Sequence, residues 1–319
     1  MILVVALNPA LDVTHYVDRA DWAGVNRPAR VHARPGGKGV NVARVLHALG
    51  AEVLLAGLTG GHTGNELRSA LRSRGVPAVF AAIAGPTRRT FTVVDGGRGD
   101  TALFSEPGPH VSAAEQDAFL ALYADALPRS SAVVLSGSLP PGLPAGMYAS
   151  LIAAAASAGV PALLDTSGEA LLLGAAAGPA IVKPNLPELT AVTGGALPRN
   201  GVHDQAAVAA VAAAAAELRR RGAGAVVVTL GADGLLAVTG EGTWLARPPA
   251  VTGNPTGAGD AAAAALARGL ASASPWPDRV AQAAALGAAA VAAPAAGDFA
   301  AADFARALAG VRVCRLGEQ

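Results

Sequence analysis

The 319-residue chain contains one cysteine, Cys314, so it cannot form a disulfide within itself. This cysteine usage gives no sign of an oxidising compartment. Charged residues are also scarce, at 15%, and 24 Lys+Arg against 23 Asp+Glu leave a net charge of +1. A chain with so little net charge lacks the excess of positive charge that binds nucleic acid or an anionic membrane. We therefore expect no nucleic-acid or membrane partner, with a cytoplasmic location as the default.

Long uninterrupted hydrophobic runs are missing as well. The longest span without a charged residue, 130–164, is broken by several prolines, so it predicts strand, loop and helix instead of a membrane span. The apolar N-terminal run ends at Asn8-Pro9 and has no basic segment before it, which predicts a first strand and not a signal peptide. Because 52% of the residues are hydrophobic, the chain has ample material for a buried core.

Short β-branched runs alternate with longer Ala/Leu-rich stretches at helical spacing. This alternation predicts an α/β fold, a doubly wound sheet covered by helices on both faces. The predicted strands are Ile2–Leu7, Val53–Gly57, Val79–Ile83, Ala132–Leu135, Ala162–Asp165, Ala180–Lys183 and Ala225–Thr229. The predicted helices between them are Gly39–Leu49, Gly64–Arg74, Ala113–Ala126, Ala145–Ala158 and Asp204–Arg221, with Ser112 and Glu115 as a capping box for the third.

The order changes after Thr229. Leu235–Val238 and Thr243–Ala246 predict an antiparallel hairpin at the edge of the sheet, and the last third is then helical. The helices expected there are 257–270, 279–293 and 301–309. No repeat or flexible linker interrupts the chain, so we expect one domain over residues 1–319.

Two segments, about 12–35 and 88–105, depart from the alternating pattern. Each contains two short β-rich stretches, and a Gly-rich turn separates those of the second segment. They predict one small antiparallel sheet that forms a lid over a site. Two unrelated surface hairpins are the alternative.

The segment Gly253–Asp260 places glycines at the start of a predicted helix. Backbone N–H groups at such a helix N-terminus approach an anion closely, and the helix dipole adds to the attraction. Asp260 falls in the first turn, where its carboxylate could accept a proton from a hydroxyl beside the anion. Simple capping of the helix is the alternative role for Asp260. Gly257, Gly259 and Ala262 also match a weak dinucleotide fingerprint, but only helices follow, which disfavours NAD.

A second Gly-rich turn, Pro35–Gly39, also leads into a helix. Gly36 and Gly37 allow backbone amides to face a ligand, while Lys38 offers a cation and Asn41 a donor and an acceptor. These groups suit a phosphorylated polyol. The alternative, a plain helix start with a solvated lysine, is disfavoured because the chain has only two lysines.

The other lysine, Lys183, ends a predicted strand, where open α/β sheets bind ligands. Asn185 and Glu188 follow on one helix face and could organise a hydrated Mg²⁺ near nucleotide phosphates, or Asn185 could simply cap the helix. Lesser candidates are Asp12 for substrate hydroxyls, Arg88 for a phosphate and Ser136 in a turn after a buried strand. The histidines show no metal-binding spacing.

Six segments, taken in order, resemble the ribokinase-like PfkB carbohydrate kinase family, and within it the 1-phosphofructokinase and tagatose-6-phosphate kinase branch. They are Asn8–Asp12, Gly36–Asn41, Ser136–Pro140, Lys183–Glu188, Thr229–Gly231 with Gly234, and Gly257–Asp260. The resemblance implies ATP-dependent phosphoryl transfer to a ketohexose phosphate (fructose 1-phosphate or tagatose 6-phosphate), a ribokinase-like sheet, and a lid that often forms a dimer interface. A kinase for an unphosphorylated sugar or nucleoside and a non-catalytic sensor are the alternatives.

The resemblance also implies roles for individual residues. Asp260 corresponds to the general base, and Gly257, Ala258 and Gly259 to the anion hole for the γ-phosphoryl group. The sugar-phosphate positions are Asp12, Gly36, Gly37, Lys38, Asn41, Arg88 and Ser136. The ATP positions are Lys183, Asn185, Thr229, Gly231 and Gly234, with Glu188 for Mg²⁺. The stretch Asn254-Pro255-Thr256 departs from the common family pattern and resembles tagatose-6-phosphate kinases, which leaves the sugar open.

Overall fold

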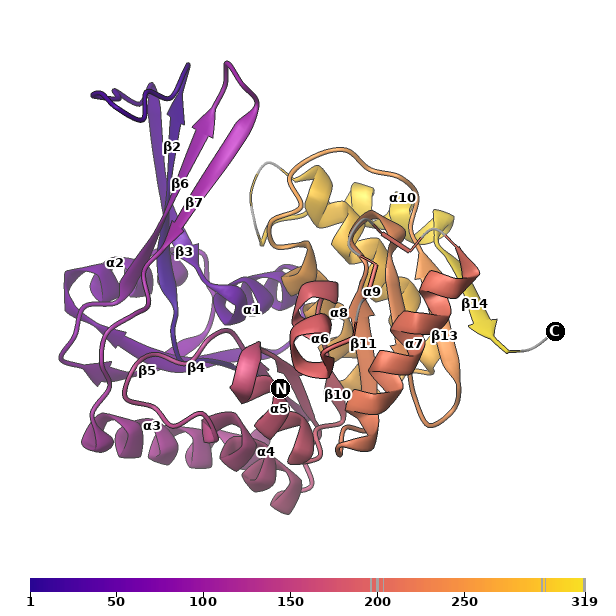
Figure 1. Cartoon of the computed structure of the whole chain (residues 1–319). Coiled ribbons are helices and arrows are strands. Elements are labelled where there is room, and N and C mark those ends of the chain that lie inside the picture. The colour runs from indigo at the N-terminus through magenta and orange to yellow at the C-terminus, as the bar shows by residue number, and fades with distance from the viewer. Residues whose placement is uncertain (196, 199–200, 203, 294, 296, 318–319) are drawn as a thin grey trace.

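The computed structural model describes residues 1–195, 197–198, 201–202, 204–293, 295 and 297–317. In this part of the chain, two sheets are present (Figure 1). The larger has the strand order β14-β13-β12-β11-β10-β9-β8-β1-β4-β5. Its strands are β1 (Ile2–Ala6), β4 (Val53–Gly60), β5 (Ala78–Ile83), β8 (Ala132–Ser136), β9 (Ala162–Asp165), β10 (Ile181–Val182), β11 (Ala225–Thr229), β12 (Leu235–Val238), β13 (Thr243–Arg247) and β14 (Arg312–Leu316).

β1 shows why this sheet is buried on both faces. Every residue of the strand is buried, and successive side chains point to opposite sides. Ile2 and Val4 pack with one hydrophobic cluster, whereas Leu3 and Val5 pack with the other. Along the sheet order β11-β10-β9-β8-β1-β4-β5, every pair of adjacent strands runs parallel, which confirms the predicted α/β sheet covered by helices.

Helices supply both covering layers. On the face of Ile2 and Val4 lie α1 (Lys38–Ala48), α2 (Gly61–Ser73), α8 (Ala258–Ala271) and α9 (Trp276–Ala292), with α10 (Ala301–Gly310) against α9. On the other face lie α3 (Ala113–Ala126), α4 (Met147–Ser157), α5 (Gly168–Ala176), α6 (Leu186–Thr193) and α7 (Gln205–Arg220). Short 3₁₀ turns occur at Leu127–Arg129 and Gly231–Asp233. The capping box of Ser112 and Glu115 at the start of α3 is confirmed.

The C-terminal side of the sheet differs from the prediction in one respect. β12 and β13 form the expected antiparallel hairpin, but β14 pairs with β13, so the hairpin does not lie at the sheet edge. β14 was not predicted, because its residues are partly exposed and lack clear alternation. α5 was also missed, because it is short and begins at a glycine in the left-handed region, Gly168.

The two segments form one small sheet, as predicted, but the sheet is mixed, because a parallel pair of strands joins its two antiparallel hairpins; we call this sheet the lid. β2 (Ala10–Val17), β3 (Arg30–Gly36), β6 (Arg88–Asp95) and β7 (Asp100–Ser105) form one four-stranded sheet in the order β3-β2-β6-β7. Each hairpin is antiparallel, while the central pair, β2 and β6, runs parallel. This pairing joins the two segments and rules out unrelated surface hairpins. Figure 1 shows the lid rising beside the carboxyl ends of the parallel strands.

Across the described residues, no helix combines the length and apolarity that a membrane crossing requires.

Candidate active site

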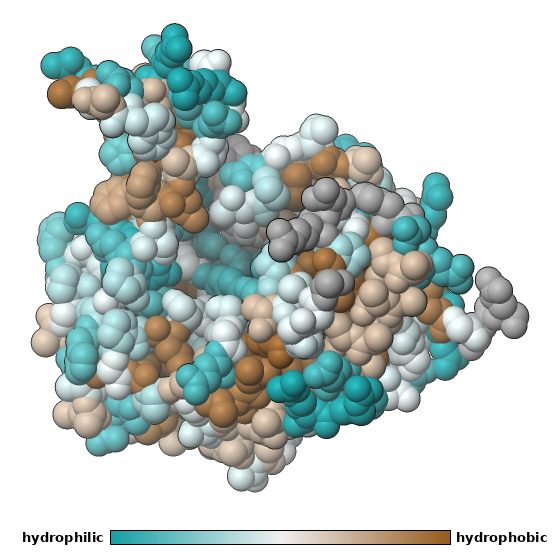
Figure 2. All heavy atoms as spheres, in the orientation of Figure 1, coloured by the Kyte–Doolittle hydropathy of each residue, from teal (hydrophilic) through white to brown (hydrophobic). Residues whose placement is uncertain are grey.

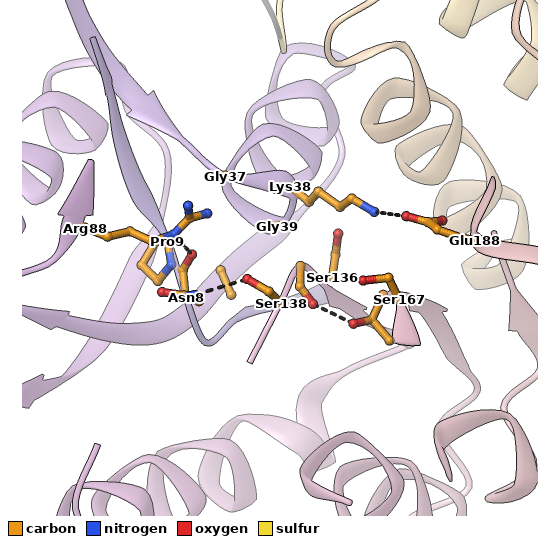
Figure 3. A pocket seen from close by; sticks show the side chains of 13 residues that line it. Asn8, Pro9, Gly37, Lys38, Gly39, Arg88, Ser136, Ser138, Ser167 and Glu188 are labelled. Atoms are coloured by element: carbon orange, nitrogen blue, oxygen red, sulfur yellow. Dashed lines mark hydrogen bonds and ion pairs between the residues drawn. The ribbon is translucent and has the colours of Figure 1, made fainter. Parts of the chain in front are cut away.

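A pocket of about 180 Å³ opens at the base of the lid, beside the carboxyl ends of β1 and β8. Figure 2 shows hydrophilic residues gathered in the hollow beneath the lid, and Figure 3 shows the pocket from close by. The pocket is lined by residues that the sequence placed far apart. Five predicted site residues meet there: Gly37, Lys38, Arg88, Ser136 and Glu188. Four of the six motifs therefore contribute to this pocket, whereas Thr229–Gly234 and Gly257–Asp260 do not line it.

Glycines at the start of α1 allow this helix to begin close to the sheet. Gly37 has a φ of 88°, a conformation that side chains other than glycine rarely adopt. A Cβ on Gly39 would lie 2.8 Å from the Cβ of Ala6 and 3.0 Å from the carbonyl oxygen of Ser136. The N-terminus of α1, with Lys38, is thereby held against the ends of β1 and β8 and borders the pocket.

Asp165, at the end of β9, joins the two lysines of the chain. Its Oδ1 lies 3.1 Å from Lys38 Nζ and its Oδ2 lies 3.1 Å from Lys183 Nζ, and the Asp165 side chain is fully buried. Burial alone would raise the pKa of Asp165, but the two ammonium groups outweigh it and hold that pKa below its ordinary value. Sequence reasoning missed Asp165 as a site residue, although an acidic residue at the end of a buried parallel strand is a usable signal.

Lys38 also contacts Glu188. The distance from Lys38 Nζ to Glu188 Oε1 is 3.0 Å. Burial would lower the pKa of Lys38, but Asp165 and Glu188 together raise it above its ordinary value, so the ammonium stays charged. An ammonium has three N–H donors, and these two carboxylates accept two of them. The third donor is available for an anion in the pocket.

Asn185 and Glu188 cap helix α6, and Glu188 also reaches the pocket. Asn185 Oδ1 accepts a hydrogen bond from the Glu188 amide at 2.8 Å, and Glu188 Oε2 accepts one from the Asn185 amide at 2.9 Å. The capping role of Asn185 is therefore confirmed, as part of a capping box for α6. Glu188 nevertheless lines the pocket and reaches Lys38 with its other oxygen.

The donor chemistry at Glu188 suits Mg²⁺. Among the described residues, no group of three or more His, Cys, Asp or Glu could enclose a metal ion. Mg²⁺, however, is held mainly by one or two carboxylates together with phosphate oxygens and water, not by a protein cage. Glu188 supplies a carboxylate of this kind at the pocket wall. The residues present thus fit a hydrated Mg²⁺ that arrives with a phosphate ligand.

The three remaining predicted nucleotide residues lie near α6 and the β11 turn. Thr229 forms a parallel bridge with Asn185, which places it beside the start of α6. Gly231 has a φ of 63° and open space around it. Gly234 has a φ of 92°, and a Cβ there would lie 2.0 Å from the carbonyl oxygen of Ala246. Hairpin packing alone therefore requires glycine at 234, and in the described part of the chain none of the three lines the pocket.

Asp260 lies in the first turn of α8, which begins at Gly257 in the left-handed conformation with a φ of 86°. The carboxylate does not cap the helix; its Oδ2 accepts a hydrogen bond from Asn41 Nδ2 at 2.9 Å. The alternative capping role is therefore wrong. A Cβ on Gly259 would lie 3.6 Å from Lys183 Nζ, so the ammonium sits beside this first turn, whose amides have no intrahelical acceptor.

The pKa of Asp260 is raised from 3.8 to about 7. Burial is the largest cause and the negative charge of Asp165 adds to it, while the hydrogen bond from Asn41 and the charges of Lys38 and Lys183 oppose the rise. Functional carboxylates commonly have a pKa shifted toward neutrality in this way. Asp260 can therefore take up a proton near neutral pH.

Asp12, Arg88 and Ser136 complete the predicted set at the lid base. Asp12, on β2, accepts a hydrogen bond from Thr90, and burial raises the pKa of its carboxyl. Arg88 Nε donates to the carbonyl oxygen of Asn8 at 3.1 Å, which fixes the guanidinium at the pocket. The Ser136 hydroxyl is buried without a hydrogen-bond partner among the described residues and lines the pocket (Figure 3). A polar ligand would satisfy it.

Asp260→Asn should stabilise the fold. The native pKa of about 7 exceeds the ordinary 3.8, so the native state binds more protons than the unfolded state between these values, and stability falls as pH rises through this window. Asn does not titrate. We expect the variant to have a higher Tm than the wild type, with a larger difference at pH 8 than at pH 5, in thermal melts. Asp125→Asn, at an exposed position, is the control, and a less stable Asp260→Asn at pH 8 would contradict the assignment.

Comparison with known proteins agrees with this geometry. The model of the pfkB family carbohydrate kinases matches residues 2–302. A 1-phosphofructokinase of Xanthomonas campestris pv. campestris is 37% identical over 273 residues, which cover 84% of this chain and 83% of that protein.

Solved structures of carbohydrate kinases are also similar to this chain. Phosphofructokinase-2 of Escherichia coli in complex with fructose-6-phosphate is 30% identical, with a TM-score of 0.85 over 97% of this chain and 98% of that one. The same E. coli protein has also been solved in a tetrameric inhibited form. Arabidopsis thaliana ribokinase with ribose and ATP shares the fold at 19% identity, with a TM-score of 0.73 over 96% of this chain and 98% of that one. The chain therefore belongs to the pfkB family of carbohydrate kinases and is a phosphotransferase that acts on a sugar hydroxyl.

Proposed function

We propose that the protein transfers the γ-phosphoryl group of ATP to a hydroxyl of a ketohexose phosphate, with fructose 1-phosphate as the first candidate and tagatose 6-phosphate as the second. The proposal rests on one observation: the helix that supplies Lys38 to the pocket also contacts the buried carboxylate of Asp260, whose pKa is raised. Lys38 and Arg88 supply cations in the pocket, and Asn41, one turn beyond Lys38, contacts Asp260. The similarity to a 1-phosphofructokinase supports the first candidate.

In this proposal the sugar phosphate binds beneath the lid. Its phosphate pairs with Arg88 and with the third N–H of Lys38, the donor that Asp165 and Glu188 do not use. The sugar hydroxyls are held by Asp12, Asn41 and the unpartnered hydroxyl of Ser136. The backbone of Gly36 and Gly37 gives the ligand close access, because neither residue carries a side chain. These contacts position the attacking hydroxyl.

Asp260 then accepts the proton of the attacking hydroxyl as the general base. The amides of Gly257, Ala258 and Gly259 form the anion hole at the start of α8, for which the Ala258 amide would exchange its bond to the Pro255 carbonyl for one to the anion. Lys183 beside Gly259 adds positive charge there. Phosphoryl transfer gains most of its acceleration from positioning and electrostatic stabilisation, which these groups provide.

The nucleotide lies along the ends of β10 and β11 in this proposal. Lys183, Asn185, Thr229, Gly231 and Gly234 would hold ATP, and Glu188 would hold Mg²⁺. When bound, Mg²⁺ shields the charge on the transferred phosphoryl group. Because Glu188 contacts Lys38, the metal residue and the sugar-phosphate residue are direct neighbours.

A kinase of unphosphorylated sugars is disfavoured by Arg88. Its guanidinium is partly buried at the pocket, where burial lowers its pKa and the charges of Asp12 and Glu106 oppose that decrease. A phosphate in the pocket would add a direct anionic partner, which a neutral sugar cannot supply. A non-catalytic sensor is disfavoured because it has no need for a carboxylate of raised pKa in the first turn of α8.

The lid also supports a homodimer. Trp22, Val31, Leu103 and Phe104 are apolar lid residues with more than half of their surface exposed. Figure 2 shows hydrophobic patches on the lid. An open sheet edge with exposed apolar side chains is well suited to pairing with a second copy. We propose that two subunits associate through their lids.

The substrate proposal is tested by measuring ADP release with fructose 1-phosphate, tagatose 6-phosphate, fructose 6-phosphate, fructose and ribose. We expect the highest kcat/KM with fructose 1-phosphate and little turnover with the unphosphorylated sugars, since these do not pair with Arg88 and Lys38. Arg88→Met should raise the KM for the preferred sugar phosphate at least tenfold, because about 1.4 kcal/mol of binding is a factor of ten. Activity restricted to fructose and ribose would overturn the proposal.

The role of Asp260 is tested by its substitution and by pH. Asp260→Asn should lower kcat by about 10²- to 10⁴-fold, because general-base catalysis contributes that much. In the wild type, kcat/KM should fall about tenfold per pH unit below a midpoint near 7, since only the carboxylate accepts the proton. Asp125→Asn is the matched control and should behave as the wild type. Near-normal turnover of Asp260→Asn would refute the base assignment.

The dimer is tested by light scattering coupled to gel filtration. The wild type should elute with twice the 31.2 kDa chain mass. Phe104→Asp should shift it to the monomer, because a charge would replace an apolar contact at the interface. Leu308→Asp, an exposed leucine on α10, is the control and should remain dimeric. A monomeric wild type would exclude the lid interface.

A further inference from the structure

A row of polar contacts connects Asp260 to the base of the lid. Asn41 donates through Nδ2 to Asp260 Oδ2 at 2.9 Å, and its Oδ1 accepts from Arg44 Nη1 at 3.5 Å. Arg44 Nη2 donates to Asp298 Oδ1. The other oxygen of Asp298 lies 3.5 Å from Arg34 Nη1, on lid strand β3. The row thus links α8, α1, the segment before α10 and the lid.

Arg44 is a buried cation within this row. It is 7% exposed, and its neighbours Asn41 and Asp260 are 5% and 8% exposed. Burial lowers the pKa of the guanidinium, and the charge of Asp298 opposes that effect. A buried charge persists only when it is paired and hydrogen-bonded. Arg44 is therefore held in place by specific partners.

Gly297 shows that the surroundings of Arg44 are closely fitted. This residue has a φ of 72°, and a Cβ on it would lie 2.8 Å from Asn41 Oδ1 and 2.9 Å from Arg44 Nη1. The backbone before α10 is thus packed directly on the contact between Asn41 and Arg44. No other residue type would fit without displacing one of the two side chains.

The chemistry of arginine fixes the orientation of the Asn41 amide. A guanidinium has only donors, so the atom of Asn41 that faces it must be the carbonyl oxygen. The NH₂ group of Asn41 then faces Asp260 and donates to the carboxylate. If the amide were reversed, two oxygens would meet, which favours the protonated acid over the carboxylate.

We infer that Arg44 is a positioning residue for phosphoryl transfer: it orients the Asn41 amide toward Asp260, and Asp298 holds Arg44 in place from the base of the lid. The inference rests on the proposed role of Asp260 as the base. It assigns Arg44 no contact with substrate, and its effect reaches the carboxylate only through Asn41.

The expected signature is a change in the titration of Asp260. The charged groups that influence this carboxyl are Asp165 at the end of β9, Lys38 on α1 and Lys183 after β10. Arg44 is not among these strongest influences, so we expect its loss to act mainly through the orientation of Asn41, and the Asn41→Ala background separates this route from a direct effect of its charge. The hydrogen bond from Asn41 favours the charged form of Asp260, and losing this bond should raise the titration midpoint.

The test is Arg44→Met, followed by ¹³C NMR titration of the Asp260 carboxyl, which is assigned by comparison with Asp260→Asn. The midpoint should move to higher pH by about one unit, the scale of one hydrogen bond to a charged group. Asn41→Ala should give a similar move, and adding Arg44→Met to Asn41→Ala should add nothing. In kinetics, kcat should fall about tenfold while the KM for ATP changes less than twofold.

The outcomes separate this inference from the proposed function. The titration needs no turnover, so it remains decisive even if the substrate panel shows no activity. An unchanged midpoint in Arg44→Met, or a full additional move in the Asn41→Ala background, would overturn the inference. Asp298→Asn, at a half-exposed position, provides a second variant should Arg44→Met fail to fold, and should move the midpoint in the same direction. Arg129→Met and Asp303→Asn, on surface helices, are the matched controls.

Discussion

The buried carboxylate of Asp165 is the interaction on which the site depends. It pairs with Lys38 and Lys183, both at 3.1 Å, and it has no exposed surface. Burying a carboxylate costs several kcal/mol unless cations and hydrogen bonds compensate, so Asp165 and the two lysines are stable only together. The pairing joins the end of β9 to the start of α1 and to the segment after β10. The sugar and nucleotide halves of the proposed site are thus tied through one side chain.

This arrangement explains why the chain has lysine at these two positions although it otherwise uses arginine. The chain has twenty-two arginines and two lysines, and both lysines contact Asp165. An ammonium is a compact charge whose donors can point in three directions, whereas a guanidinium is a planar fork. Lys38 donates to two carboxylates on different elements and still has a donor for the pocket. A guanidinium directs its donors within one plane, so it is less suited to acceptors that lie on different elements.

The sequence was sufficient for the fold class and the lid but not for every element. Buried parallel strands such as β1 consist of local apolar runs, and the glycines at α1 and α8 mark their helix starts, so local pattern finds them. β14 is partly exposed and forms a strand because β13 lies beside it. The parallel pairing of β2 with β6 likewise depends on contacts between distant segments. Patterns within a short window carry no information on such pairings.

In the site, too, local sequence patterns reveal some residues, whereas contacts between distant segments determine others. Motifs with glycines, Lys38 or Asp260 were recognisable because their chemistry lies within a few residues, and the pocket confirms that several of them meet. Asp298 lies 254 residues from Arg44, and no local pattern links the two. Their contact follows from the packing of α1 and the segment before α10 on each other.

Burial raises the pKa of Asp260, and neighbouring groups limit how far it rises. Burial thereby favours the neutral acid, and the negative charge of Asp165 adds to this effect. The two lysines and the amide of Asn41 oppose this effect and bring the pKa to about 7. A base is most effective when its pKa lies near the working pH, because it is then both unprotonated and basic enough to take a proton. The Asn41 amide, which contacts Asp260, therefore also helps to bring its pKa into the range that the proposed base role requires.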